Sequence, residues 1–246
     1  MGGGIINSMT NFFDFHKDKL AIYSNSSEWK EINFNFSNSF FKDEVLSFIK
    51  EKTIAGNPST IYWETSNFTL IPQSVFHSKH IENYLQLNFG EISDEHDFHF
   101  DILHSQQAVI VYSIPKWIKE LKEHYFPIIP LKHHAGQLLA RSRGEMNDFV
   151  SIVVYKERFL IIILKNGKLQ ICNNIEYQNE IDILYFLILH HQKLELSSTT
   201  KLNFYDFETN IPLNQIQESF INFREFENYK INWSSIDEFY KTILCV

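Results

Sequence analysis

A strand-turn-strand pattern occurs twice in this chain, and it constrains the fold more than any other feature of the sequence. The strand, turn and strand of the two copies are Leu20–Tyr23, Ser24–Ser27 and Trp29–Phe36, then Val150–Val154, Tyr155–Arg158 and Phe159–Leu164. In the first copy Ile32, Phe34 and Phe36 alternate with polar residues, which is the period of a half-buried strand. A hairpin that opens each half of the chain predicts a two-lobed α/β protein.

The second half of the chain gives the clearest order of elements, βββαβαβα. Its expected strands are Phe149–Val154, Phe159–Leu164, Lys168–Cys172, Leu202–Tyr205 and Phe223–Phe226, and its expected helices are Glu180–Leu194, Pro212–Phe220 and Ser235–Leu244. Asn166-Gly167 is the strongest hairpin signal in the chain. Three antiparallel strands extended by parallel ones through helical crossovers are the order of a ribonuclease-H-like lobe.

The first half approximates the same order with an extra hairpin. Its helices are expected at Phe41–Lys52, Val75–Phe89, Lys116–Tyr125 and Ala135–Arg143, and its extra hairpin at Phe98–His104 and Ala108–Ser113. Residues 1–18 are interpreted as a loose lead-in. We therefore expect an N-terminal lobe over 19–143 and a C-terminal lobe over 149–246, with the boundary between Arg143 and Phe149.

The composition is typical of a globular protein, and its charge does not favour binding to polyanions. Of the 246 residues 44% are hydrophobic and 21% charged, and the net charge is −8. A negative surface repels phosphate backbones and anionic lipids, so neither nucleic acid nor a membrane surface is expected as a partner. The longest apolar runs, Phe159–Leu164 and Ile183–Leu189, are shorter than the ~20 residues of a membrane span. With two cysteines and no signal peptide, a cytoplasmic protein is expected.

Several stretches resemble known proteins over most of the chain from Leu20 onward. They are Phe68–Pro72 with Val75-Phe76, Tyr125-Phe126-Pro127, and Asn173–Tyr177 followed by Asp182–Phe186. On these the chain resembles an uncharacterised Bacteroidota family, a domain of unknown function, related to the actin-like ATPase superfamily. The resemblance implies an α/β fold of two ribonuclease-H-like lobes in tandem, an actin-like ATPase architecture with degenerate phosphate loops.

Actin-like ATPases hold nucleotide phosphates with two hairpin turns of the form Asp-x-Gly. If the first hairpin is aligned on that form, Tyr23 and Asn25 replace the aspartate and the glycine; in the second, Tyr155 and Glu157 replace them. Neither expected turn contains glycine or aspartate, so ATP hydrolysis is not expected. The polar residues left to bind an anion in a cleft between the lobes are Ser26, Ser27, Lys156 and Arg158. The competing interpretation of these four, which we favour, is that they are simple polar turn residues.

Other chemistry has weaker support. The acids nearest to a nuclease arrangement are Glu64 and Asp101, and neither has a partner that the sequence can place. The histidine pairs His77/His80, His133/His134 and His190/His191 lack a third ligand at metal spacing, so we interpret them as surface or helix-end residues and expect no metal site. No nucleophile elbow, P-loop or dinucleotide motif is present.

We conclude from the sequence that the chain is a non-catalytic scaffold or interaction protein with an unidentified protein partner and no cofactor. The alternative is a nucleotide-binding ATPase or small-molecule kinase with divergent phosphate loops. Aromatic residues near the C-terminus are expected to fill the core of the second lobe, with a partner groove as the alternative: Phe220, Phe223, Phe226, Tyr229, Trp233, Phe239 and Tyr240.

Overall fold

The computed structural model describes residues 12–23, 29–52, 58–142, 145, 147–197, 200–207, 209–223, 226 and 229–244. The chain divides into two compact units. The first consists of Met1–Leu103, Gln107–Gln137 and Leu244–Val246, and the second of His104–Gln106 and Leu138–Ile243. The lobe limits 19–143 and 149–246 remain sequence predictions.

The first unit is built on a five-stranded sheet in the order β3-β2-β1-β4-β8. The strands are β1 (Phe12–Phe15), β2 (Lys19–Tyr23), β3 (Trp29–Asn33), β4 (Thr60–Trp63) and β8 (Leu131–His133). The pairs β1–β2 and β2–β3 are antiparallel, and the pairs β1–β4 and β4–β8 are parallel. The first strand of the chain therefore lies in the middle of the sheet.

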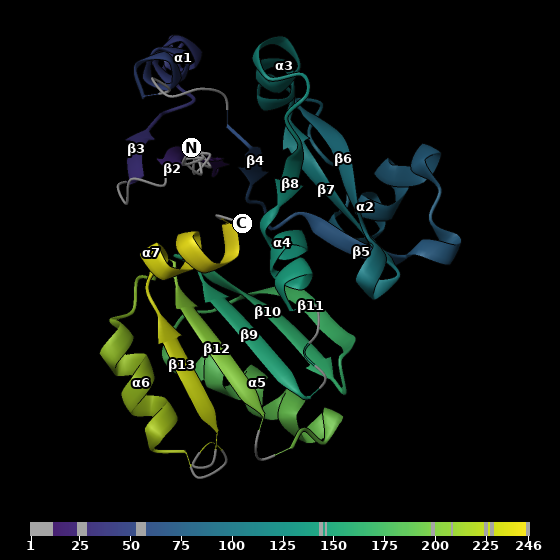
Figure 1. Cartoon of the computed structure of the whole chain (residues 1–246), viewed down its shortest axis with the longest axis vertical. Helices are drawn as coiled ribbons and strands as arrows, with labels where there is room; N and C mark the ends of the chain where they lie inside the picture. Colours follow the sequence, from purple (N-terminus) through teal and green to yellow (C-terminus); the bar gives the residue numbers. More distant parts are fainter. Residues whose placement is uncertain are drawn as a thin grey trace, which may run out of the picture. The chain divides into compact units, whose positions relative to one another are not determined.

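The second unit contains a sheet of the same order and the same strand directions, β11-β10-β9-β12-β13 (Figure 1). Its strands are β9 (Phe149–Val154), β10 (Arg158–Lys165), β11 (Lys168–Glu176), β12 (Lys201–Asp206) and β13 (Lys230–Ser234). Asn166 and Gly167, with φ of 51° and 71°, make the predicted tight turn between β10 and β11. Two ribonuclease-H-like topologies thus follow one another along the chain.

Helical crossovers complete both units. They are α1 (Phe41–Lys52) between β3 and β4, α5 (Glu180–Leu194) between β11 and β12, and α6 (Leu213–Ile221) between β12 and β13. Asn179 caps α5 by accepting from the backbone N–H groups of Ile181 and Asp182. The helices α4 (His134–Arg141) and α7 (Ile236–Phe239) follow the last strand of their sheets, and a π-helical segment, Tyr240–Leu244, follows α7.

A small subdomain, which we call the insertion, lies between β4 and β8 in the chain. Its sheet has the order β5-β7-β6, and its elements are β5 (Phe68–Pro72), α2 (Ile81–Phe89), β6 (His96–Leu103), β7 (Ala108–Pro115) and α3 (Lys116–Tyr125). Leu85 of α2 packs with Val109 and Val111 of β7 in a core of its own. In the second unit the described residues between β12 and β13 contain α6 and no additional sheet, so the insertion is where the two units differ.

The core of the second unit explains its apolar strands. Every residue of β9 is buried, and so are Phe159 to Leu164 of β10, because side chains cover both faces of the sheet. Ile183, Leu184 and Leu187 of α5 pack on one face together with Phe220 of α6. The C-terminal aromatic residues Phe220, Phe226, Phe239 and Tyr240 are buried, which confirms their interpretation as core.

Four sequence predictions about elements are wrong. The residues interpreted as a loose lead-in contain β1, a fully buried strand. The last strand is Lys230–Ser234 rather than Phe223–Phe226, where Phe226 instead packs on Phe220. Helix α2 begins at Ile81 rather than Val75, because two short 3-10 turns precede it and no side chain caps it earlier. Helix α5, whose apolar run Ile183–Leu189 predicts a buried crossover helix, exposes Ile181 and Tyr185.

Candidate functional site

The turn after the first strand of each sheet has the same construction in both units. In the first unit the turn is His16-Lys17-Asp18, where His16 N donates to Lys19 O at 2.8 Å and Phe34 N donates to Asp18 O at 2.8 Å. In the second unit it is Tyr155-Lys156-Glu157, where Tyr155 N donates to Arg158 O at 2.8 Å and Tyr177 N donates to Glu157 O at 3.2 Å. We call these the first turn and the second turn.

This correspondence corrects the position of the first turn. The predicted turn at Tyr23–Ser27 follows β2, one strand too late, because β1 had been interpreted as lead-in. Tyr23 is a buried residue at the end of β2, and it stacks on Phe12. Asn25, Ser26 and Ser27 lie outside the described residues. The second turn, with Lys156 and Arg158, is where the sequence predicted it.

The true first turn also lacks glycine, but it contains an aspartate. Asp18 lies in the turn, and Asp14 lies on β1, two residues before the first residue of the turn. Asp14 is fully buried. An aspartate therefore does stand next to the first turn, and its surroundings decide what it can bind.

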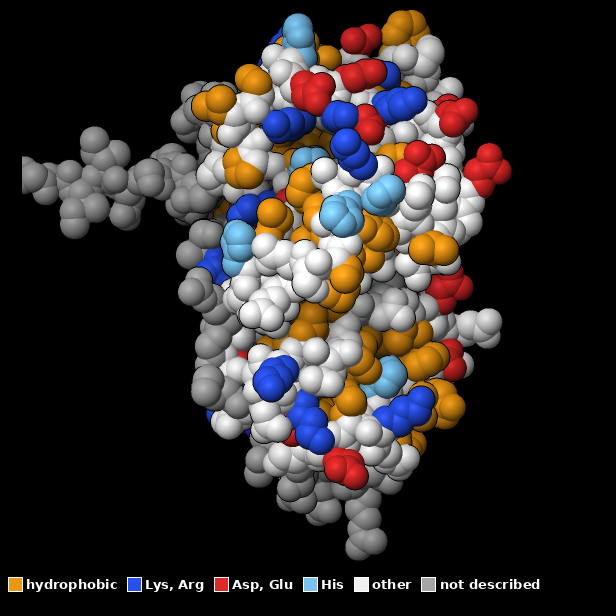
Figure 2. All heavy atoms as spheres, turned by 90° about the vertical axis from the view of Figure 1, so that its right-hand side faces the viewer, with side chains coloured by type: hydrophobic (Ala, Val, Ile, Leu, Met, Phe, Trp, Pro, Cys, Tyr) orange, Lys and Arg blue, Asp and Glu red, His pale blue; other side chains and the backbone are white. Residues whose placement is uncertain are grey.

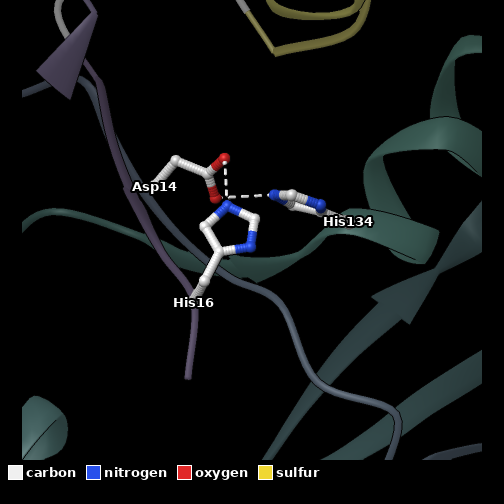
Figure 3. Close-up of side chains that lie close together, drawn as sticks. All are labelled: Asp14, His16 and His134. Carbon is white, nitrogen blue, oxygen red and sulfur yellow. Dashed lines mark hydrogen bonds and ion pairs between the residues drawn. The ribbon is translucent and has the colours of Figure 1, made fainter. Parts of the chain in front are cut away.

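Two imidazole rings converge on the Asp14 carboxylate (Figure 3). His134 Nε2, at the start of α4, lies 2.6 Å from Asp14 Oδ1, and His16 Nε2 lies 3.0 Å from Asp14 Oδ2. All three side chains are buried: His134 and Asp14 expose nothing, and His16 exposes 8% of its surface. We call these three residues the Asp-His-His cluster.

The electrostatics of the cluster favour a charged carboxylate. Burial alone would raise the pKa of Asp14, but the charges and hydrogen bonds of His134 and His16 outweigh burial and hold this pKa well below its usual range. Burial acts to lower the pKa of His16. The charge and the hydrogen bond of Asp14, together with the charge of Glu64, outweigh burial and raise this pKa overall. The Glu64 carboxylate, also buried, lies 3.9 Å from His16 Nδ1.

The second turn is built from different side chains. The Arg158 guanidinium lies over the Tyr155 ring, 4.5 Å from its centroid, and donates to Asn174 Oδ1 at 3.1 Å. Tyr177 Oη donates to the Tyr155 carbonyl at 2.7 Å. Of the two basic residues that the sequence left as candidate anion ligands here, Arg158 is thus engaged within its own hairpin, whereas Lys156 is exposed at the tip.

The other predicted residues do not form a common site. Asp101 Oδ2 accepts from Tyr112 Oη at 3.2 Å and from His133 N at 3.3 Å, whereas Glu64 Oε2 faces His16 Nδ1 at 3.9 Å. His77 and His80 are exposed, as expected. His133 and His134 are buried, against the surface interpretation of that pair. Burial raises the pKa of the Cys172 thiol well above its usual value, which disfavours the thiolate form.

Sequence reasoning missed the Asp-His-His cluster because its members are far apart in the chain. His134 lies 120 residues after Asp14, and only the pairing of β1 with β4, and of β4 with β8, brings them together. A D-x-H spacing at 14 and 16, where β1 ends, was the available signal, because residues two apart in extended chain share a face. That signal was hidden by the interpretation of residues 1–18 as lead-in.

Comparison with known proteins identifies the family. The model of the family described as "Protein of unknown function (DUF3822)" matches residues 13–205. The chain belongs to the DUF3822 family. No curated protein sequence matches this DUF3822 chain.

Solved structures show the fold. A Bacteroides thetaiotaomicron protein with an actin-like ATPase fold and unknown function matches with a TM-score of 0.71 and 16% identity, over 96% of this chain and 95% of that one. The PilM-PilN type IV pilus biogenesis complex matches with a TM-score of 0.49 and 11% identity, over 92% and 88%. The cytoplasmic domain of EpsL of the Vibrio cholerae type II secretion system matches at 0.45 and 12%, over 92% and 90%. The first of these confirms the predicted actin-like ATPase fold.

The helices of the described ranges were also compared with the requirements of a bilayer crossing. None of them has both the length and the apolar character that such a crossing needs.

Proposed function

We propose that this DUF3822 protein does not hydrolyse nucleotides and that it acts by binding another protein. One observation supports the proposal. The turn after the first strand of each sheet lacks glycine, and the charged side chains beside it that could bind a phosphate or its metal ion instead contact residues of the same unit. Asp14 is enclosed by His16 and His134, and Arg158 is engaged by Tyr155 and Asn174. The backbone approach and the free carboxylate that phosphoryl transfer needs are therefore missing.

The acidic residues of the turns strengthen this argument. Asp18 and Glu157 occupy the same place in the two turns, since the backbone of Phe34 or Tyr177 donates to their carbonyls. Both side chains are exposed at the tip, next to Lys17 or Lys156. A carboxylate beside each lysine offsets its attraction for phosphate, so neither turn concentrates positive charge.

The insertion supports the expectation of a protein partner. It exposes six large apolar side chains: Val75 (57% exposed), Leu87 (84%), Phe89 (40%), Ile102 (45%), Tyr125 (42%) and Ile128 (87%). Figure 2, which looks onto the side where β5, β6 and α2 lie in Figure 1, shows apolar groups among histidines and charged residues. Exposed apolar side chains edged by polar ones are typical of protein-binding surfaces.

A phosphate-release assay tests the first part of the proposal. Purified protein with Mg-ATP is expected to release phosphate no faster than the double variant Lys17→Ala/Lys156→Ala, because neither turn is arranged to stabilise a transferring phosphoryl group. The double variant also controls for contaminating ATPases. Turnover by the wild-type chain that this variant loses would contradict the proposal.

Co-purification tests the second part. A cross-linked partner is expected to be recovered with the wild-type chain and lost with the double variant Leu87→Asp/Ile102→Asp, whose circular dichroism should be unchanged because both residues are exposed. The matched control is Ile221→Asp, since Ile221 of α6 is 80% exposed but lies in the second unit. Recovery of the same proteins by all three chains would argue against a binding surface on the insertion.

A second candidate function is a nucleotide-binding enzyme with divergent turns, either an ATPase or a small-molecule kinase. The observation that favours it is the pair of exposed lysines, Lys17 and Lys156, at the same position of the two turns. A lysine can act as a point charge toward a phosphate without the backbone contacts of a glycine-rich turn. The same lysine variants therefore separate the two candidates.

A further inference from the structure

We propose that the Asp-His-His cluster binds a divalent transition metal ion, with Zn²⁺ as the best fit. The ligands would be one Asp14 carboxylate oxygen, His16 Nε2 and His134 Nε2. These three ligand atoms lie within 4.8 Å of one another, and all three residues are buried. Two imidazole nitrogens and a carboxylate oxygen are a ligand set that suits zinc, with a fourth position left for water or another ligand.

The distances leave little rearrangement to be made. Ligand atoms around a tetrahedral Zn²⁺ with bonds of about 2.0–2.1 Å lie about 3.4 Å apart. His134 Nε2 lies 2.6 Å from Asp14 Oδ1 and His16 Nε2 lies 3.0 Å from Asp14 Oδ2, and the three ligand atoms all lie within 4.8 Å of one another. Each pair of ligand atoms would need to shift by less than about 1.5 Å, as the ion replaces the shared protons of the two hydrogen bonds.

The second unit acts as an internal control on whether the fold requires these polar groups. The pairing of β1 with β2 and β4 matches that of β9 with β10 and β12, so Asp14 corresponds to Val153 and His16 to Tyr155. His134, the first residue of α4, corresponds to Ile236, the first residue of α7. The second unit builds the same place with apolar or aromatic side chains.

A buried carboxylate with two imidazoles is therefore no requirement of the architecture. Burying charged groups carries a desolvation cost that hydrophobic residues of similar volume avoid. A metal-binding role gives the first unit a reason to keep them. The same comparison places Phe207 where the first unit has Glu64, because the backbone of each donates to the last residue of the sheet's first strand.

Glu64 supplies an independent feature of metal sites. Histidines that bind zinc usually turn their other ring nitrogen toward a carboxylate, which fixes the orientation of the ring. His16 Nδ1 faces Glu64 Oε2 at 3.9 Å while His16 Nε2 faces Asp14. The path from solvent to His16 is short, because the next two residues of the chain, Lys17 and Asp18, are exposed.

Metal titration of the full chain tests this proposal. After chelation and dialysis, Zn²⁺ competed against a chromophoric chelator is expected to bind one per chain, and excess Mg²⁺ should not displace it because imidazole is a poor ligand for Mg²⁺. Asp14→Asn and His134→Gln should each weaken Zn²⁺ binding by about 100-fold or more, and Glu64→Gln by about 10-fold. Co²⁺ bound in the wild-type chain should give the intense visible absorption of a four-coordinate site.

The control is the double variant His77→Gln/His80→Gln, which removes an exposed histidine pair and should keep the one-to-one binding. Wild-type protein that binds no stoichiometric Zn²⁺ would overturn the proposal, and this result needs no variant to fold. Binding that persists in folded Asp14→Asn and His134→Gln, or that disappears with His77 and His80, would overturn it as well. A phosphate-release assay is unaffected by these outcomes, so this proposal and the proposed function can fail separately.

Discussion

Asp101 is a partly buried carboxyl group, and its hydrogen bonds compensate only part of the cost of burying its charge. It lies on β6, and its Oδ2 accepts from Tyr112 Oη and from the backbone of His133. Burial raises the pKa of Asp101 to about 6, although these two donors and Lys132 act to lower it. The folded state therefore holds this proton to a higher pH than the unfolded chain, where an aspartate has a pKa of about 3.9.

The sign of the pH dependence follows from this shift. Between pH 4 and pH 6 the folded chain binds more protons than the unfolded chain at this site, so the contribution of Asp101 to stability falls as the pH rises. Asp101→Asn keeps the shape and has no charge to lose. Its free energy of unfolding relative to wild type should therefore rise by about 2 kcal/mol between pH 4 and pH 7.

Urea unfolding of both proteins at the two pH values measures this difference. Asp94→Asn, a change at an exposed loop position, serves as the control and should show almost no difference. A stability difference between Asp101→Asn and wild type that does not change with pH would show that Asp101 is not held in a protonated state.

At the scale of elements, two glycines at helix positions play opposite roles. Gly136, the third residue of α4, would place a Cβ atom 3.5 Å from Ile110, 3.7 Å from Leu103 and 3.9 Å from Asp101, all ordinary contacts. Gly90 ends α2 with a φ of +72° and a ψ of −151°, a conformation that only glycine adopts readily. One glycine weakens its helix, whereas the other is required.

Alanine substitution at the two positions should therefore change stability in opposite directions. Gly136→Ala is expected to raise the free energy of unfolding by about 0.5–1 kcal/mol, because the helix interior favours alanine and the added methyl group fits. Gly90→Ala is expected to lower it by about 1–3 kcal/mol through backbone strain. Denaturant unfolding of the two variants and of wild type measures both changes in the free energy of unfolding. Changes of the same sign in the two variants would contradict the opposite roles given to the two glycines.

Element bounds could be predicted where the chain marks them. Helices α1, α3 and α5 have the predicted limits, since acidic residues, Pro115 or Asn179 mark their starts. Helix α2 could not be placed as well, because no side chain caps it and apolar residues continue the helical spacing back to Val75. Strand β1 was missed because a polar Asp14 interrupts its apolar run, and only the sheet shows why that aspartate is buried.

At the scale of the whole molecule, the repeated topology could be predicted but its alignment could not. The sequence shows two hairpin-led halves, and both sheets have the same strand order. The first hairpin was nevertheless assigned to β2 and β3 instead of β1 and β2. Pairing of β1 with β2 and with the distant β4 fixes the alignment, and the pairing with β4 is not encoded in local periodicity.

The central claim is that the two turns, each beside its sheet's first strand, hold their own side chains and no nucleotide phosphate. Calorimetric titration of the full chain with Mg-ATP tests it most directly. We predict no saturable heat up to about 1 mM nucleotide, a concentration at which even a weak phosphate site would begin to fill. One-to-one binding that is abolished in the double variant Lys17→Ala/Lys156→Ala would contradict the account.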